Sequence, residues 1–329
     1  MSDPANQEQQ PQEEEKENLW NKILKETINQ DRGRQDATIL IIGEDKAGKH
    51  ALVHAMEKAS GDRVVLESRN DKSLVNVMSD KKLASVIDYF YFSIKNPDDE
   101  NMELGKINIY FASPEADIDH LNIILKKKAL QNFSVMVVLD FEKYWDIADN
   151  IPKWLSFINE KVAPGMMQLD LDTSDNLKKK LEDIVMNYSE PHITENGETL
   201  NRISDISPEK ADNLMLPTGC LTPNYGFPII FAINKCDHIL QIKQQANADE
   251  ILEMIEYKLR KDLVNLTSPI VYTSTKMNIN TTVLFDYLKF LHFKIPFKHS
   301  SNLNKDTLFI PMGLDNPDVL EATFSTSGI

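Results

Sequence analysis

The feature that most constrains the fold is an eight-residue loop set between two regular patterns. It consists of Gly43, Glu44, Asp45, Lys46, Ala47, Gly48, Lys49 and His50. Residues 37–42 (ATILII) precede it, and a short, β-branched apolar run of this kind is typical of a strand buried on both faces. Residues 51–59 (ALVHAMEKA) follow it with a helical pattern. The loop matches seven of the eight positions of the phosphate-binding pattern G-x-x-x-x-G-K-[ST], in which backbone N–H groups surround a phosphate.

The eighth position of this P-loop is occupied by His50. A serine or threonine hydroxyl at this position ligates Mg²⁺, whereas an imidazole is not a natural ligand for a hard, oxygen-seeking cation. We therefore expect no firmly bound Mg²⁺, although Lys49 remains available to meet phosphate. The alternative is that His50 only begins a helix beside an empty loop.

Two further motifs follow later apolar runs. Asn234, Lys235 and Asp237 form N-K-x-D directly after residues 227–233 (FPIIFAI). An aspartate there can accept two hydrogen bonds from guanine N1–H and its 2-amino group, a donor pair that adenine lacks. Ser274, Thr275 and Lys276 follow residues 269–273 (PIVYT), where GTPases carry a loop that contacts the base; an ordinary polar loop is the alternative. The expected cofactor is GDP or GTP, with guanine favoured over adenine, and an empty site is the alternative.

The parts needed for hydrolysis are missing from the sequence. The strand at residues 106–111 is followed by Ala112-Ser113-Pro114-Glu115-Ala116-Asp117, which contains no D-x-x-G and loses one backbone N–H donor at Pro114. No glutamine is placed to orient a water, and no first-switch threonine is evident before residue 85. Phosphoryl transfer depends on metal ions and positioned charge. We therefore predict a pseudo-GTPase with no catalytic residues and no metal ligands; a nucleotide switch with weak hydrolysis is the alternative.

The predicted elements alternate between strands and helices. Strands are expected at residues 37–42, 85–94, 106–111, 134–139, 227–233 and, last, 269–273, and helices at 119–130, 151–162, 249–266 and 281–291. This order predicts an α/β fold of the P-loop GTPase-like (Ras-like) kind: a doubly wound, mainly parallel sheet with one antiparallel edge strand and helices on both faces. Trp20, Trp145 and Trp154 lie in amphipathic patterns and are predicted to be packing residues.

Three segments are expected along the chain. Residues 1–18 are polar and acidic and are predicted to be disordered. Residues 19–294 form the GTPase-like domain, beginning with a short helix at Trp20. They include an insertion at about 163–226 that is predicted to be partly disordered, apart from a helix capped by Asp or Ser within LDTSDNLKKKLEDIVMNY. Residues 295–329 are a C-terminal extension.

Composition limits the partners and the compartment. A net charge of −15 repels phosphate backbones and anionic membranes, so we expect neither nucleic-acid binding nor membrane insertion. No apolar run approaches the roughly 20 residues that cross a bilayer. Two cysteines do not form a disulfide framework, and an acidic N-terminus is not a secretory signal, so the expected location is the cytosol. Lysines 126 to 128 and 178 to 180 are expected to form solvated helix surfaces or partner contacts.

The chain resembles the light intermediate chains of cytoplasmic dynein. The similarity includes IIGEDKAGK, VMVVLDFEKYWD, KWLSF, LPTGCLTPNYGFPIIFAINKCD, YTSTKMNINTTVLFDYLKF, FKIPF and DTLFIPMGLDN, and covers most of residues 19–318. Lys46 stands where the family has glycine, and His50 where it has threonine.

This resemblance implies a non-catalytic accessory subunit of the microtubule motor, located in the cytoplasm with the cytoskeleton and supporting cargo transport. It also implies a Ras-like domain that packs against the dynein heavy-chain tail. Cargo adaptors bind a C-terminal region in the family, so adaptors are expected as partners only if such a region exists beyond Ile329.

Overall fold

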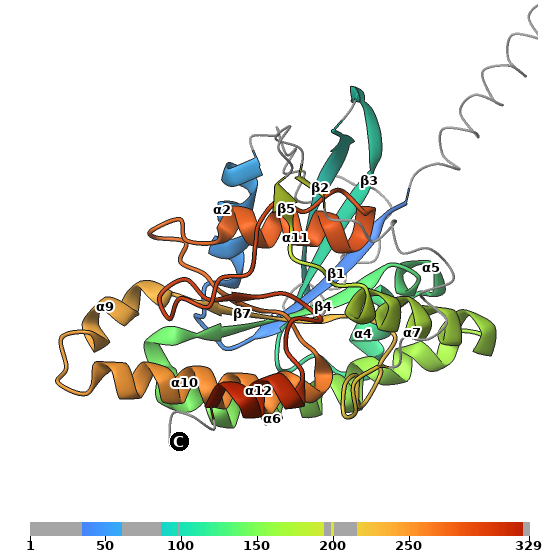
Figure 1. Ribbon diagram of the computed structural model, residues 1–329. Coiled ribbons are helices and arrows are strands. Elements are labelled where there is room, and N and C mark those ends of the chain that lie inside the picture. Colours follow the sequence, from blue (N-terminus) through green and yellow to red (C-terminus); the bar gives the residue numbers. More distant parts are fainter. Residues whose placement is uncertain (1–34, 61–86, 98, 194–198, 201–215, 325–329) are drawn as a thin grey trace, which may run out of the picture.

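The computed structural model describes residues 35–60, 87–97, 99–193, 199–200 and 216–324 (Figure 1). The predictions for residues 1–18 and for the helix at Trp20 lie outside these ranges, as does most of the polar part of the insertion. Among the described residues, no helix combines the length and the apolar character needed to cross a membrane.

The centre of the fold is a seven-stranded sheet in the order β2-β3-β1-β4-β7-β8-β9. The strands are β1 (Ala37–Gly43), β2 (Ile87–Asn96), β3 (Asp99–Ala112), β4 (Phe133–Asp140), β7 (Ile229–Asn234), β8 (Ile270–Tyr272) and β9 (Phe309–Ile310). Strand β1 pairs in parallel with β3 and β4, and the parallel pairing continues through β7 to β8. Strand β2 pairs antiparallel with β3 and forms the predicted antiparallel edge. The predicted α/β, mainly parallel fold is confirmed.

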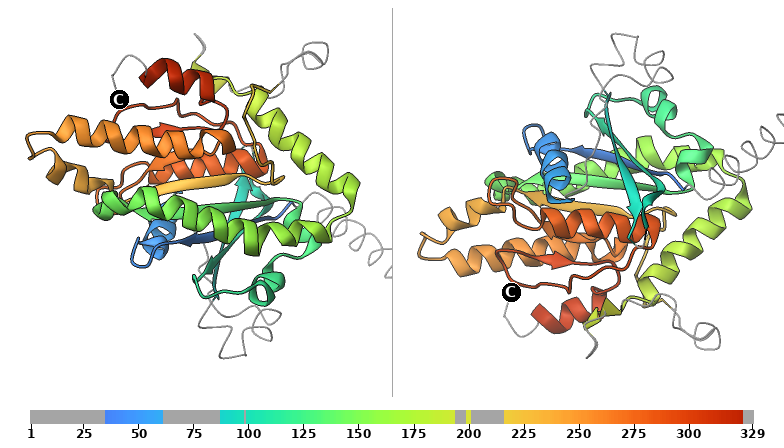
Figure 2. Two further views of the ribbon diagram at one scale, coloured as in Figure 1. Left: turned by 90° about the horizontal axis from the view of Figure 1, so that it is seen from below. Right: turned by 90° about the horizontal axis from the view of Figure 1, so that it is seen from above.

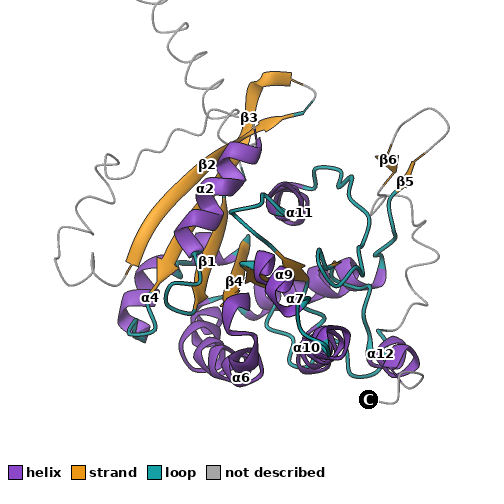
Figure 3. Cartoon of the chain, turned by 90° about the vertical axis from the view of Figure 1, so that its left-hand side faces the viewer, coloured by secondary structure: helices purple, strands orange, loops and turns teal. Residues whose placement is uncertain are grey.

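Helices cover both faces of the sheet (Figures 1 and 3). On one face lie α2 (Lys49–Ser60) and α11 (Thr281–Phe293), whose buried leucines join the hydrophobic cluster around Ile39 and Ile41. On the other face α4 (Ile118–Ile124), α6 (Ile147–Phe157) and α10 (Ala248–Leu263) pack against the cluster around Leu40 and Ile42. The apolar run of β1 therefore divides alternately between two cores, as expected for a strand buried on both sides.

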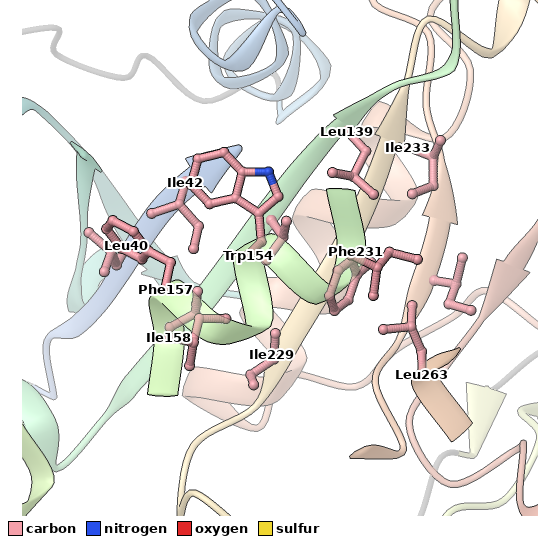
Figure 4. Close-up of a cluster of buried hydrophobic side chains, with 14 of the residues drawn as sticks. Leu40, Ile42, Leu139, Trp154, Phe157, Ile158, Ile229, Phe231, Ile233 and Leu263 are labelled. Atoms are coloured by element: carbon pink, nitrogen blue, oxygen red, sulfur yellow. The ribbon is translucent and has the colours of Figure 1, made fainter. Parts of the chain in front are cut away.

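The tryptophan predictions have different outcomes. Trp154 on α6 is 2% exposed and packs among Ile42, Leu139 and Phe231, so its predicted packing role is confirmed (Figure 4). The same prediction was wrong for Trp145, whose surface is 62% exposed. Trp145 lies in a 3-10 helix, η2 (Phe141–Asp146), in which Lys143 has non-helical dihedral angles. A tighter, irregular turn does not keep residues i and i+4 on one face, so Phe141 is buried while Trp145 faces outward.

Several helix boundaries differ from the predicted ones. The helix predicted at 119–130 is two short helices, α4 and α5 (Lys127–Leu130), separated at Leu125 and Lys126. The helix predicted at 151–162 begins earlier, at Ile147, and its last turn is a π-helix, η3 (Ile158–Val162). Within the insertion, a 3-10 helix η4 (Ala163–Gln168) leads into α7 (Leu171–Met186). The side chain of Asp170 caps α7 by accepting from the backbone N–H of Thr173, so the cap is an aspartate, as predicted, but it lies one residue before the predicted segment.

Smaller elements complete the chain. Strands β5 (His192–Ile193) and β6 (Thr199–Leu200) form a separate two-stranded sheet. The 3-10 helix η5 (Cys236–His238) and α9 (Ile239–Ile242) follow β7, and η6 (Val264–Leu266) follows α10. Cys220 and Cys236 are both buried and unpaired.

The prediction that residues 269–273 form the last strand was wrong. The C-terminal segment returns to the sheet, where β9 pairs antiparallel with β8 and forms the second edge (Figure 2). Leu308 and Met312 are buried on either side of β9, and the hydroxyl of Tyr287 accepts a hydrogen bond from the backbone N–H of Met312 at 2.9 Å. The last helix, α12 (Pro317–Phe324), packs on α10. Residues 308–324 are therefore built into the domain.

Candidate functional site: a P-loop with altered surroundings

The P-loop joins the carboxyl end of β1 to the first turn of α2 and crosses the end of β4. Gly43 has a φ of +139°, and a Cβ at this position would stand 2.0 Å from the carbonyl oxygen of Val138. The backbone N–H of Glu44 donates to that same oxygen at 3.1 Å. Because no L side chain fits this space, Gly43 is needed for the loop to pass so close to β4.

Lys49 is held by the loop itself. Its ammonium donates to the carbonyl oxygens of Gly43 at 2.9 Å and Glu44 at 2.7 Å. Burial lowers the pKa of Lys49, while the nearby charges of Asp45 and Glu44 oppose that shift. An ammonium has three N–H donors, so one donor remains for an anion at the loop.

The side chain of Glu44 is hydrogen-bonded to a neighbouring helix. Its Oε1 accepts from the side-chain amide of Asn150 on α6 at 2.8 Å. Burial raises the pKa of Glu44, and the charge of Asp140 raises it further. Glu44 therefore belongs to the interface between the loop and α6.

Lys46, the residue found where the similar family has glycine, adopts a left-handed conformation with φ of 62°. A residue with a Cβ pays about 1–2 kcal/mol in this region. Asp45 and Lys46 are exposed, whereas Ala47 is buried. The loop thus keeps the backbone path that a glycine favours, with a strained lysine at its outer edge.

The three predicted motifs are brought together at the carboxyl edge of the sheet. The side-chain amide of Asn234 donates to the carbonyl oxygen of Ala47 at 2.7 Å, and the hydroxyl of Thr273 donates to Asn234 Oδ1 at 3.2 Å. The hydroxyl of Ser274 donates to Asp237 Oδ1 at 2.7 Å. The exposed Lys276 places its ammonium 3.9 Å from Asp237 Oδ2. Thr275, between Ser274 and Lys276 in the sequence, is half-buried. Asp237 is therefore positioned by the loop after β8.

Lys235 points toward β4. Its backbone is left-handed, with φ of 63°, and its ammonium donates to Asp140 at 2.6 Å and to Glu142 at 3.1 Å. Burial works to lower the pKa of Lys235, but the two carboxylates outweigh it and leave the pKa raised. The same lysine lowers the pKa of Glu142 through its hydrogen bond. Asp140 and Glu142 lie within the VMVVLDFEKYWD segment of the family resemblance, but nothing in the sequence marked them as partners of Lys235.

His50 is fixed on the opposite side of the loop. Its ring stacks on Phe111 with centroids 4.2 Å apart and planes 11° apart, and its Nε2 lies 3.1 Å from a carboxylate oxygen of Asp88. A cavity of about 360 Å³ adjoins it, lined by residues of the P-loop, the start of β2 and residues 111–114. His50 thus fills the position of the usual metal-ligating hydroxyl with an aromatic ring that already has partners on β2 and β3.

Polar groups of the segment after β3 form hydrogen bonds within the domain. Ser113 Oγ accepts from the backbone N–H of Glu115 at 3.2 Å, and Lys161 donates to the carbonyl oxygen of Ala116 at 2.5 Å. The carboxylate of Asp117 accepts from the backbone N–H of His120 at 3.0 Å and caps α4. Hydrogen bonding from the His120 backbone is the main reason that the pKa of Asp117 is lowered.

A sequence model of the dynein light intermediate chain family matches residues 14–324. The chain belongs to the dynein light intermediate chain family. It is 26% identical over 326 residues to cytoplasmic dynein 1 light intermediate chain 1 of Homo sapiens, covering 95% of this chain and 58% of that protein. It is 24% identical over 353 residues to the protein of that name from Dictyostelium discoideum, covering 97% of this chain and 66% of that protein. The chain therefore spans less than two-thirds of the length of these relatives.

A crystal structure of the conserved domain of a dynein light intermediate chain has a similar fold. The TM-score is 0.61 at 14% sequence identity, and the alignment covers 88% of this chain and 86% of the other. This likeness supports the shared fold of the light intermediate chain domain.

For this light intermediate chain, local sequence signals located the P-loop, the N-K-x-D motif and residues 274–276 but missed the side chains that contact them. Asp88 and Phe111, which hold His50, are separated from it by 38 and 61 residues. Asn150, which holds Glu44, is 106 residues away. The aromatic residues 89–92 of β2 were the one available signal that aromatic side chains lie near this side of the loop.

Proposed function

We propose that this light intermediate chain is a non-catalytic accessory subunit of a cytoplasmic dynein motor, which docks on the heavy-chain tail and supports microtubule-based transport. Membership of the family and similarity to proteins named as cytoplasmic dynein 1 light intermediate chains support the dynein assignment. The corresponding location is the cytoplasm, with the cytoskeleton. Adaptor binding is not proposed for the residues of this chain.

The observation that carries the non-catalytic part of the proposal is the setting of His50. Phosphoryl transfer requires a metal ion and charges aimed at the γ-phosphate. Here the metal-side position holds an imidazole stacked on Phe111 and bonded to Asp88, and Asp117 is engaged in capping α4. Neither group is free to organise Mg²⁺ or a γ-phosphate in this arrangement.

A guanine nucleotide without firmly bound Mg²⁺ is proposed as a structural ligand. The residues that would hold it are the P-loop glycines Gly43 and Gly48, the remaining donor of Lys49, and the carboxylate of Asp237 toward the base. A ligand that binds only the folded state stabilises it by RT ln(1 + [L]/Kd).

Thermal unfolding with GDP, GTP or ATP tests this proposal. GDP and GTP should raise the melting temperature, ATP should not, and EDTA should leave the shifts unchanged. Asp237→Ala should abolish the shift. Equal melting temperatures with and without every nucleotide would favour an empty site.

Association with a purified dynein heavy-chain tail fragment tests the docking role. The folded chain should co-purify with the tail in a defined ratio, and it should do so with or without nucleotide. A folded chain that fails to associate would end the proposal. The alternative function, a GTPase switch, predicts instead a large difference between GDP and GTP affinity that disappears with EDTA.

A further inference from the structure

Two apolar side chains at the start of α7 are unusually exposed. Met167 is 86% exposed and Leu171 is 82% exposed, the largest values among the large hydrophobic side chains of the described residues. They are four residues apart, one in η4 and the other at the first position of α7. A single exposed apolar residue is ordinary, but two such residues close together in the chain at a helix entry offer a small apolar patch that a partner can cover.

Three lysines adjoin this patch. Lys126, Lys127 and Lys128 lie in and before α5, and all three are exposed. The two segments are in direct contact, because Leu125 packs within 2.8 Å of where a Gly165 Cβ would stand and Gln168 donates to the side chain of Asn122 at 3.2 Å. In Figure 1 α4, α5 and α7 all lie toward the right-hand end of the sheet. We call Lys126, Lys127, Lys128, Met167 and Leu171 the apolar–lysine surface.

The domain offsets the positive charge of this surface only in part, through the charge of Asp170, which interacts with that of Lys127. Within the described ranges, none of the three lysines has a carboxylate at ion-pair distance, whereas Lys243, Lys258, Lys289 and Lys305 each have one. The carboxylate of Asp170 accepts hydrogen bonds from Thr173 N at 3.1 Å and Thr173 Oγ1 at 2.7 Å, and the charge of Lys127 is the smallest of the influences that lower its pKa. In a chain of net charge −15, three adjacent exposed lysines without an ion-pair partner concentrate positive charge at one place.

We propose that the apolar–lysine surface binds an acidic amphipathic segment of a partner polypeptide. Carboxylates of that segment pair with the three lysines, and its apolar side chains cover Met167 and Leu171. The unbranched methionine adapts to differently shaped apolar partners. Extended polyanions are disfavoured as ligands. An anionic bilayer or a nucleic acid also faces the rest of the chain, whose net charge of −15 repels it, whereas a short peptide contacts only the apolar–lysine surface.

This surface lies at the other end of the sheet from the P-loop. Helix α5 leads through Gln131 and Asn132 into the amino end of β4, whereas the P-loop crosses the carboxyl end of β4. Binding there should therefore not depend on nucleotide. The inference deepens the docking role proposed above by naming a face for it, but the surface can be tested without the heavy chain.

A fluorescently labelled synthetic helical peptide, with glutamates on one face and leucines on the other, is the probe. Its anisotropy on titration with the purified chain should show binding that weakens as salt rises. The variant Lys126→Glu/Lys127→Glu/Lys128→Glu and the variant Met167→Ser/Leu171→Ser should each weaken binding by about tenfold or more. Both should keep the melting temperature of the unaltered chain, because all five side chains are exposed.

Matched controls use exposed residues elsewhere. Lys58→Glu/Lys95→Glu/Lys261→Glu makes the same change in net charge, and Leu240→Ser/Met254→Ser removes two apolar side chains that are 54% and 61% exposed. Helices α9 and α10, which carry the second pair, extend toward the opposite side of the molecule in Figure 1. These controls should bind the peptide as the unaltered chain does. No binding by the unaltered chain, or equal losses in surface and control variants, overturns the proposal.

Two further arms separate the alternatives. Vesicles containing phosphatidylserine should not bind; binding of vesicles but not peptide, lost in the surface variants, would replace the polypeptide with a membrane. With the heavy-chain tail fragment, a surface variant that loses both peptide and tail identifies this face as the docking face. If the tail does not bind even the unaltered chain, the proposed docking role is wrong. The peptide titration still shows whether the apolar–lysine surface binds an acidic amphipathic segment.

Discussion

The side-chain amide of Asn234 donates a hydrogen bond to the carbonyl oxygen of Ala47 across 2.7 Å, in the space where a side chain on Gly48 would stand. A Cβ at Gly48 would lie 2.6 Å from Asn234 Nδ2, and Gly48 has a φ of +84°. Asn234 is 1% exposed and also accepts from Thr273. The first residue of the N-K-x-D motif is therefore a structural link that joins the P-loop to the ends of β7 and β8.

Gly48→Ala should destabilise the fold by about 2–3 kcal/mol, because the added methyl combines left-handed strain with a clash against Asn234. Urea unfolding measures the loss. Gly219→Ala is the matched control, since Gly219 has a φ of +87° but its nearest neighbour would be 3.4 Å from a Cβ. The control should lose only about 1–2 kcal/mol from strain. Equal losses at the two positions would show that Asn234 moves aside without cost.

Lys46→Gly should stabilise the domain, by about 0.5–1 kcal/mol, because relief of the left-handed strain exceeds the added backbone entropy of the unfolded chain. Lys46 is exposed and has φ of 62°. The same substitution at Lys153, an exposed position inside α6, should instead destabilise by about 1 kcal/mol. Opposite signs of the two changes, measured by urea unfolding, are the expected result; a loss at both positions would contradict the strain argument.

The sequence predicted the parts of the fold that rest on local patterns. The run ATILII before Gly43, in which only Thr38 is polar, predicts β1 because a strand buried on both faces has few polar positions, and the helical pattern of α10 is equally regular. Strand β9 was missed because its two residues, Phe309 and Ile310, carry no periodicity; the free edge of β8 gives them their structure. The P-loop and N-K-x-D motifs were found in the same way, as contiguous residues.

The surroundings of the site could not be predicted because they depend on distant contacts. His50 was expected to leave no firmly bound Mg²⁺, but its stacking on Phe111 was not expected, because it follows from the pairing of β1 with β3. The attachment of Lys235 to Asp140 spans 95 residues and follows from the pairing of β4 with β7. Nothing in the local sequence of either residue records those pairings.

His292 should make stability depend on pH. It is 4% exposed; its Nδ1 lies 2.8 Å from Asn132 Oδ1 and its Nε2 lies 2.9 Å from the hydroxyl of Ser134. Because the amide oxygen can only accept, the neutral ring donates through Nδ1 and accepts from Ser134 through Nε2. Burial, followed by the charge of Lys180, lowers the pKa of His292 to about 3.

The direction of this pH dependence follows from the protonation of His292 in the folded and unfolded chains. Between about pH 6.5, where an unfolded histidine titrates, and about pH 3, the unfolded chain binds a proton that the folded chain does not. The contribution of His292 is therefore complete above that window and is lost as pH falls through it, by about 1.4 kcal/mol per pH unit. Urea unfolding at pH 7, 5.5 and 4.5 should give a shallower pH dependence for His292→Gln than for the unaltered chain. Parallel curves would mean that the buried ring accepts a proton without cost.

Arg260 holds the C-terminal segment to α10 through a buried ion cluster. Arg260 is 2% exposed, and its guanidinium donates to both carboxylate oxygens of Asp315 at 2.8 and 2.7 Å and to Glu256 at 2.9 Å. Burial raises the pKa of Glu256.

Arg260→Met leaves two buried carboxylates without their cation, so it should destabilise the fold by about 3–5 kcal/mol. Lys258→Met, which breaks the 3.2 Å pair with Asp262 on the same helix, should cost less than about 1 kcal/mol because Lys258 is 49% exposed. Brief proteolysis should cut Arg260→Met near Asp315 before the rest of the domain, since α12 and Phe324 lose their anchor. If the two variants unfold at the same urea concentration and resist protease equally, the cluster does not hold the C-terminal segment in place.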